Sequence, residues 1–550
     1  MRSQCCWLAP ALAGALAAAL GAQEAPTPTV FGETVEVRVV NLEVEVFDRD
    51  GLSVTGLGPA DFELTVDGEL LPIRYFTEIR GGTAVAAEAS TGEITAVPDL
   101  VAGEPVGTNY LVFVDDFFPL ARDRDRVLQA LRDDVGRLKP EDRMAIVAFD
   151  GNELTMLSTW TNSARELERT LRDATRRPSH GLRRLSERRS LASDRAASRT
   201  FPGIERRRLS RFDTRLDISE RFYAETLEQQ LDNMVSAVAA ALRGFANPPG
   251  RKVLLLFAGG WPFDVGEFVT SEFGRAVAEP GVKRGRQIFA PIIDTANQVG
   301  YSIFTVDVPG LAASGLADVE SATISEGDER FASFLRQNNQ QYTLQRIATE
   351  TGGRALLGAR RLEALAAAES ATRTYYWLGF SPLWQGDDGL HSVAVRVLRE
   401  GLKTRARTSY VDFSRSSEVT AAVESVLLFG GGPGVLDLAL TTGKPILKSA
   451  RIMQVPIAIE LPTAQLTLLP SAEGAVAELE LRVAAVDERG GRSTIPVLPM
   501  RLVVPAERTP GTTARYETLL ELRRMRNRIV VAVYDPTTGS LWSKAVEVKP

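Results

Sequence analysis

Two hydrophobic periods alternate along this chain and divide it into segments. Residues 35–47 alternate apolar and polar positions with a period of two, which is typical of a half-buried strand. Two further short strands are predicted on either side of the Asp67–Gly68 turn. We therefore expect a small antiparallel β domain over residues 23–80, followed by a linker rich in Ala, Gly, Thr and Pro over residues 81–107.

From residue 108 the pattern changes to strands that alternate with helices. An apolar strand over 111–114 precedes a helix with its apolar residues on one face, and a capping box at Ser163–Glu166 opens a later helix. Further buried strands are predicted at residues 144–149, 253–257 and 303–306. This alternation predicts a mostly parallel sheet with helices on both faces, within an α/β domain over residues 108–411.

Two inserts interrupt this domain, and another β-rich segment follows it. The first insert, residues 176–217, is dense in arginine, which is typical of a polyanion-binding patch or of a solvated loop. Only Phe201 and Phe212 lie among these arginines, so we favour the solvated loop and expect no nucleic-acid partner. The second insert, residues 310–338, is acidic. Residues 412–550 again alternate between strands and turns and predict a C-terminal β-sandwich.

The N-terminus has the features of a signal peptide. Arg2 precedes a short apolar stretch at residues 8–20, so we predict a signal peptide over residues 1–22 and export to the periplasm or the extracellular space. A retained membrane anchor is the alternative, but the stretch is too short to span a bilayer comfortably. Both cysteines, Cys5 and Cys6, precede this stretch, so the mature chain has no thiol for a disulfide, a metal site or a nucleophile.

Two acids end the strand that opens the α/β segment. Asp115 and Asp116 are followed by Phe117-Phe118-Pro119. The segment resembles the opening of a von Willebrand factor A (vWA) domain, a Rossmann-like module that usually holds a divalent ion above its sheet. Four groups of segments, taken in order, resemble a bacterial secreted family of vWA-related proteins that is described chiefly from Acidobacteria. The groups are residues 44–51 with 61–64, residues 110–116 with 143–149, residues 351–354, and residues 375–382 with the strands that end at Tyr410. The resemblance implies a vWA fold between two β domains, and it implies no known reaction.

The resemblance also implies where an ion would bind, and this chain departs from that pattern. The family's site is similar to Asp-x-Ser-x-Ser with a later Thr and Asp, an oxygen-rich set that suits magnesium. Neither register, from Asp115 or from Asp116, places a hydroxyl at the serine positions, and Gly259 stands where the later Asp is expected. We therefore expect a degenerate metal-ion-dependent adhesion site with no metal and no other cofactor. The residues that could still form a weak magnesium or manganese site are Asp115, Asp116, Thr161 and Asp264.

Aromatic residues are predicted to gather at the same end of the sheet, where they form a candidate interaction surface. Its residues are Phe117, Phe118, Trp160, Trp261 and Phe263. Exposed rings beside acids suit a protein partner. The alternative is that the rings fill the place of the lost ion and have a structural role.

Candidate chemistry is otherwise sparse, which favours a binding role. No Gly-x-Ser-x-Gly motif and no phosphate-binding loop occur, so we predict no catalytic residue. The net charge of −6 gives no general attraction to nucleic acid. We accordingly expect an exported, non-catalytic protein that binds a protein or another envelope macromolecule, without a transmembrane segment in the mature chain. The alternatives are a magnesium- or manganese-dependent adhesin that uses Asp264, and an envelope hydrolase with an unrecognised site.

Overall fold

The computed structural model describes most of the chain from residue 39 to residue 550. The described segments are 39–85, 100–187, 190, 216, 218–245, 250–271, 281–310, 326–429, 435–471, 474–488, 493–504 and 513–550. The predicted signal peptide and most of the arginine-rich insert lie outside the described residues. Among the helices that are described, we find none whose length and hydropathy together would allow it to cross a membrane.

A six-stranded mixed sheet forms the centre of the part in which strands and helices alternate. Its strand order is β11-β10-β9-β6-β7-β8, and neighbouring strands are parallel except for the antiparallel pair β7–β8. Nearly all residues of β6, β7, β9 and β10 are buried, as expected for strands covered on both faces. The bounds are β6 (Thr108–Asp115), β7 (Arg143–Phe149), β8 (Leu154–Thr161), β9 (Arg251–Ala258), β10 (Tyr301–Asp307) and β11 (Ala355–Leu356).

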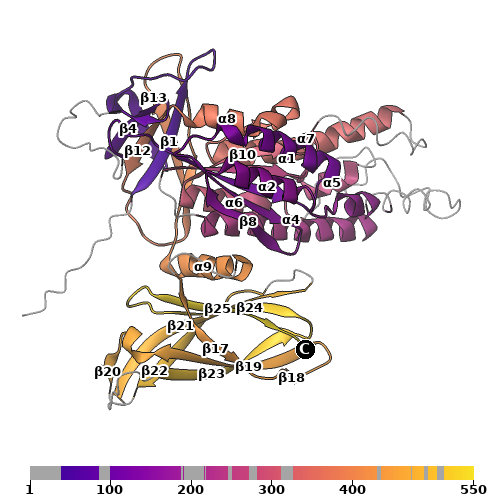
Figure 1. Cartoon of the computed structure of the whole chain (residues 1–550), viewed down its shortest axis with the longest axis vertical. Helices are drawn as coiled ribbons and strands as arrows, with labels where there is room; N and C mark the ends of the chain where they lie inside the picture. The colour runs from indigo at the N-terminus through magenta and orange to yellow at the C-terminus, as the bar shows by residue number, and fades with distance from the viewer. Residues whose placement is uncertain are drawn as a thin grey trace, which may run out of the picture. The chain divides into compact units, whose positions relative to one another are not determined.

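Helices cover both faces of this sheet (Figure 1). Alternate residues of β6 enter two separate cores, so that Leu111 and Phe113 pack in one and Tyr110 and Val112 in the other. The first core includes residues of α4 (Ile218–Gly244), α5 (Val265–Ser271), α6 (Arg286–Val299) and α7 (Glu326–Glu350). The second includes residues of α1 (Ala121–Asp134), α2 (Ala164–Ala174) and α8 (Ala364–Thr372). Short 3-10 helices are η1 (Pro59–Asp61), η2 (Val135–Arg137), η4 (Gly358–Glu363) and η5 (Thr463–Gln465).

The strands that precede β6 form sheets with strands from much later in the chain. β1 pairs with β12 and β2 pairs with β13, so residues 40–84 and residues 375–412 share two sheets, of order β14-β1-β12-β4-β5 and β15-β13-β2-β3. Figure 1 shows the indigo strands β1 and β4 beside the orange strand β12. The bounds are β1 (Val40–Phe47), β2 (Phe62–Val66), β3 (Glu69–Leu70), β4 (Tyr75–Arg80), β5 (Thr83–Ala84), β12 (Tyr375–Phe380), β13 (Gly389–Val397), β14 (Lys403–Arg405) and β15 (Ser409–Asp412).

The C-terminal part begins with helix α9 (Arg415–Phe429) and continues as two sheets that share one core. One sheet has the order β16-β25-β24-β21-β20, with β22 paired to β21, and the other has the order β17-β19-β18, with β23 paired to β19. The bounds are β16 (Val435–Asp437), β17 (Ala439–Thr442), β18 (Ile446–Leu447), β19 (Ile452–Pro462), β20 (Leu469–Ser471), β21 (Gly474–Asp487), β22 (Val497–Val504), β23 (Thr513–Arg523), β24 (Asn527–Tyr534) and β25 (Leu541–Val548).

The predicted fold class, a vWA-type α/β domain flanked by two β units, is wrong. The structure is mixed, with 33% helix and 39% strand, and most strands belong to antiparallel or mixed sheets in several β-rich units rather than to one Rossmann-like core. The reason is that a period of two marks a strand without indicating its partner. The N-terminal strands complete their sheets only with β12 and β13, more than 300 residues away in sequence.

Candidate functional site

Asp115 ends β6 and is completely buried. Its Oδ1 accepts hydrogen bonds from the backbone N–H groups of Phe117 (2.8 Å) and Phe118 (2.9 Å). Its Oδ2 accepts from the backbone N–H of Gly259 (2.9 Å) and from the indole Nε1 of Trp261 (2.9 Å). Four N–H donors therefore surround one carboxylate, which joins the loop after β6 to the loop after β9.

The hydrogen bonds also determine what the Asp115 carboxylate can bind. Burial raises the pKa of Asp115 to about 6, and the hydrogen bonds from Phe118, Trp261, Phe117 and Gly259 act in the opposite direction. The group is therefore mostly ionised at neutral pH. A metal ion would have to displace N–H donors to reach either oxygen, so Asp115 does not fit the role of a magnesium ligand.

Asp116 forms a buried ion-pair network with two arginines. Its Oδ1 lies 2.7 Å from Nη1 of Arg124, and its Oδ2 lies 2.7 Å from Nε of Arg177. Burial raises the pKa of Asp116, while Arg177 and Arg124 lower it. The Arg124 guanidinium also donates to the carbonyl oxygens of Thr175, Arg177 and Pro178, beyond the end of α2. Asp116 thus holds this segment in place and does not fit an ion site either.

The predicted interaction surface requires correction, because two of its aromatic residues are buried. Phe118 is 7% exposed and Trp261 is 0% exposed, and their ring centroids lie 6.5 Å apart. Phe117 is half-buried and packs edge-on against Phe118 at 5.1 Å. The Arg184 guanidinium lies 4.1 Å from the Phe118 ring centroid. Phe118 and Trp261 therefore fill the space beside Asp115, and their rings are not available to a partner.

Thr161 and Trp160 lie at the opposite end of the sheet from Asp115, contrary to the prediction. Thr161 pairs with Met144 at the start of β7, whereas Asp115 pairs with Phe149 at its end. The strand between these two positions of β7 is about 16 Å long. The physical reason is that β8 runs antiparallel to β7, so its last residues return to the amino ends of the parallel strands. Thr161 therefore cannot share an ion with Asp115.

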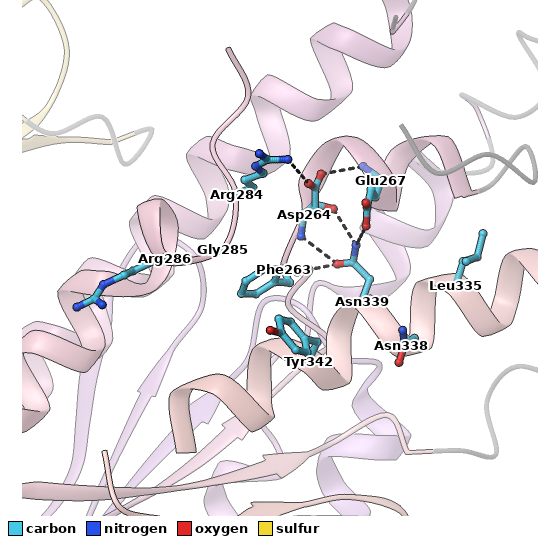
Figure 2. Close-up of a pocket in the computed structure, with 10 residues that line it drawn as sticks. All are labelled: Phe263, Asp264, Glu267, Arg284, Gly285, Arg286, Leu335, Asn338, Asn339 and Tyr342. Atoms are coloured by element: carbon cyan, nitrogen blue, oxygen red, sulfur yellow. Dashed lines mark hydrogen bonds and ion pairs between the residues drawn. The ribbon is translucent and has the colours of Figure 1, made fainter. Parts of the chain in front are cut away.

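The two remaining predicted residues, Phe263 and Asp264, line a pocket of 510 Å³ (Figure 2). The pocket is formed by the start of α5, the start of α6 and the middle of α7. Oδ1 of Asp264 accepts a hydrogen bond from the backbone N–H of Glu267 (2.9 Å), which caps α5. The Phe263 ring meets the Tyr342 ring edge-on at 4.6 Å. Asp264 therefore caps the N-terminus of α5, and it lies in a different site from Asp115.

Asn339 of α7 fixes the rim of this pocket. Its Oδ1 accepts hydrogen bonds from the backbone N–H groups of Phe263 (2.7 Å) and Asp264 (3.1 Å), and its Nδ2 donates to the carbonyl oxygen of Asp264 (3.1 Å). The Arg284 side chain is 62% exposed and lies 3.8 Å from Oδ2 of Asp264. Burial and the neighbouring charge of Asp264 raise the pKa of Glu267. The pocket therefore presents rings, amides and charges of both signs on a hydrogen-bonded frame, as Figure 2 shows.

The sequence pattern did not indicate the contribution of α7 to this pocket. Asn339 and Tyr342 lie just after the acidic insert, in a helix without a clear apolar face. One signal was present, because residues 337–341 are a run of amide side chains (QNNQQ) that is unusual within a helix. Such a run offers hydrogen-bonding groups to any loop that packs against the helix.

Gly259 shows why the expected acid is absent after β9. A Cβ atom at this position would lie 2.4 Å from Cδ of Pro119 and 2.6 Å from Cβ of Phe118. We therefore expect Gly259→Ala to lower the free energy of unfolding by about 2 kcal/mol through overpacking. Chemical denaturation should show this loss, whereas Gly136→Ala should change stability little because a Cβ there meets nothing within 4 Å. Equal stability of the two variants would contradict the close packing of the loops.

Comparisons with known proteins identify no family for this chain. No family model and no curated protein match it. Among solved structures, it is similar over 32% of its length to a β-glucuronidase from Bacteroides uniformis, at 12% identity and a TM-score of 0.15. It is also similar over 80% of its length to a pilus adhesin from Lactobacillus rhamnosus GG, at 8% identity and a TM-score of 0.23. The matched parts span 19% of the glucuronidase and 57% of the adhesin.

Proposed function

We propose that this protein is an exported, non-catalytic binding protein that takes a short polar segment of a partner protein into the pocket between α5, α6 and α7. The observation that carries the proposal is the frame made by Asn339, which fixes the rim while charged and aromatic groups beside it stay accessible. Tyr342 is 44% exposed, and the Arg284 side chain is more exposed still. Tyrosine and arginine are enriched among the residues that dominate binding energy at protein interfaces.

The charges of the pocket suit a partner segment that carries both signs. Arg284 can bind a partner carboxylate through two parallel hydrogen bonds. The Tyr342 ring offers an apolar face to a side chain of the partner. Glu267 lies on the same rim and can attract a cation, and its raised pKa means that this charge is lost at a higher pH than for an exposed glutamate. A segment with alternating charges therefore matches the pocket better than a purely acidic or purely basic one.

The other titratable groups support binding rather than catalysis. The carboxylate oxygens of Asp115 and Asp116 are engaged by protein donors. In the described part of the chain, neither His180 nor His391 forms a hydrogen bond with a serine or threonine hydroxyl, which a histidine-activated nucleophile requires. Function has to be argued from a site, and the α5–α7 pocket is the site with accessible recognition groups.

The double variant Arg284→Ala/Tyr342→Ala tests the proposal. Each immobilised protein is exposed to envelope extract and culture fluid of its source cells, and retained proteins are crosslinked and quantified by mass spectrometry. The variant should retain its partner at least about tenfold less well than the wild type, since loss of two central contacts costs more than about 1.4 kcal/mol.

A matched control separates the pocket from general surface effects. The double variant Arg396→Ala/Phe222→Ala removes an arginine side chain that is 71% exposed and a phenylalanine that is 72% exposed, both outside the pocket. This control should retain the partner as well as the wild type does. Equal retention by all three proteins would exclude the pocket as the binding site, and retention no better than that of denatured protein would contradict a binding role.

A further inference from the structure

A second cluster of chemically active side chains lies in the sheet that contains β13 and β15. Asp387 precedes β13, His391 lies within it, and Asp412 ends β15, which pairs with β13 in antiparallel register. One ligand atom from each of these three residues lies within 4.8 Å of the other two. Two ligand atoms bound to one tetrahedral zinc ion at about 2.0 Å would lie about 3.3 Å apart. Small side-chain rotations, above all of the exposed Asp387, therefore bring the three atoms to an ion.

Asp412 provides evidence for a ligand that is independent of the clustering. It is 2% exposed, and its Oδ2 accepts hydrogen bonds from the backbone N–H groups of Gln385 (2.5 Å) and Gly386 (3.0 Å). Its Oδ1 is buried and has no hydrogen-bond partner among the residues that the structure describes. Buried carboxylate oxygens normally have a partner, and leaving a charged one without any is costly. A cation beside Oδ1 would satisfy it.

His391 has the carboxylate partner that metal-bound histidines usually have. Its Nδ1 lies 2.7 Å from Oδ2 of Asp67, so Nε2 is the nitrogen that remains for an ion. Asp67 is itself fixed by the backbone N–H (2.8 Å) and hydroxyl (3.1 Å) of Ser392. The imidazole ring also stacks on the Tyr410 ring, with centroids 4.9 Å apart and planes 16° apart. A carboxylate that holds the second nitrogen of the ring is the arrangement that fixes the tautomer of metal-bound histidines.

We propose that Asp387, His391 and Asp412 bind a divalent transition-metal ion, with Zn²⁺ as the preferred ion. One imidazole nitrogen and two carboxylate oxygens form a ligand set that suits zinc, and the imidazole disfavours magnesium and calcium. Three protein ligands leave the fourth position of a tetrahedral ion to water or to a donor from a bound molecule. The ion would join the turn before β13 to the end of β15.

Calorimetry on tag-free protein tests this site directly. The full mature chain is treated with a chelator, dialysed and titrated with zinc chloride. One zinc ion should bind per chain in the wild type. His391→Ala removes a direct ligand and should weaken binding at least about tenfold, which is the smallest loss typical when an outer-shell partner of a metal ligand is removed. His180→Ala removes the other histidine of the chain and should bind zinc as the wild type does.

Two further measurements keep the result interpretable if His391→Ala also loses stability. Asp387→Asn retains the Oδ1 that accepts a hydrogen bond from the backbone N–H of Gly389 (2.8 Å), so the turn should stay folded while the affinity for zinc falls. Magnesium at millimolar concentration should give no comparable heat. The proposal is overturned if the wild type binds no zinc, if both His391→Ala and Asp387→Asn bind it unchanged, or if magnesium binds as tightly as zinc.

Discussion

Replacing Asp115 by asparagine is expected to lower the free energy of unfolding by about 3 kcal/mol at neutral pH, although the two side chains have the same shape. Both oxygens of Asp115 accept hydrogen bonds only from N–H groups. An asparagine amide has one oxygen and one NH₂ group, so in either orientation its NH₂ faces two N–H donors. These donors are buried and would lose their acceptor, which costs about 1–3 kcal/mol for each unsatisfied group.

The loss can be measured by chemical denaturation with circular dichroism as the signal. Asp133→Asn is the matched control, since its side chain is 64% exposed and lies on the neighbouring helix α1. We expect that variant to stay within about 0.5 kcal/mol of the wild type. A loss of less than about 1 kcal/mol in Asp115→Asn would mean that the four donors do not depend on the carboxylate.

The pH dependence of this difference tests the titration of Asp115. Its pKa is about 6 in the folded protein and near 3.9 in an unfolded chain. The folded state therefore binds the proton more tightly, and the stability from this group is full below about pH 4 and is lost as the pH rises through 6. Asparagine does not titrate, so the deficit of Asp115→Asn should be larger at pH 4.5 than at pH 7.5. A deficit that becomes smaller at low pH would show that the N–H donors lower the pKa of Asp115 by more than burial raises it.

The sequence predicted single elements better than it predicted their partners. The apolar strand at residues 111–114 is confirmed as β6, and Ser163 is confirmed as the N-cap of α2, although the Glu166 carboxylate accepts from the Thr161 hydroxyl and does not complete the capping box. Both are local features. An apolar run marks a buried strand, and a helix N-cap bonds to a residue three positions later, so neighbouring residues are enough to predict each of them. The pairing of β1 with β12 depends on residues far apart in sequence, and no local period encodes it.

The candidate sites show the same limit. A buried carboxylate needs hydrogen-bond donors, and Asp115 accepts from loop amides on two different loops, a combination that adjacent residues do not reveal. Thr161 was assigned to the wrong end of the sheet because sequence gives the strand but not its direction. The approach of His391 to Asp67 and Asp412 is created by the registers of β13 with β2 and β15. Such a cluster has no sequence signature until those pairings are known.

Replacing Arg124 by methionine is expected to destabilise the protein by about 3–5 kcal/mol, because it leaves Oδ1 of the buried Asp116 carboxylate without its arginine partner. Both side chains are buried, with 1% exposure for Arg124 and 0% for Asp116. Arg177 remains 2.7 Å from Oδ2 of Asp116, but it is 22% exposed and does not replace the pairing at Oδ1. Arg124→Lys should lose nearly as much, because an ammonium group cannot reach the carboxylate and the carbonyls of Thr175 and Pro178 at once.

Thermal and chemical denaturation of three further variants separates the contribution of the ion pair to stability from the contribution of packing at the same place. Arg122→Met is the matched control on α1, since that arginine is 62% exposed and lies 3.4 Å from its partner Asp123. The double variant Asp116→Leu/Arg124→Met removes both buried charges, so it should lose at least about 1 kcal/mol less than the sum of Asp116→Leu and Arg124→Met. Additive losses would mean that Arg124 stabilises the fold through its carbonyl contacts and its pair with Asp125, and not through Asp116.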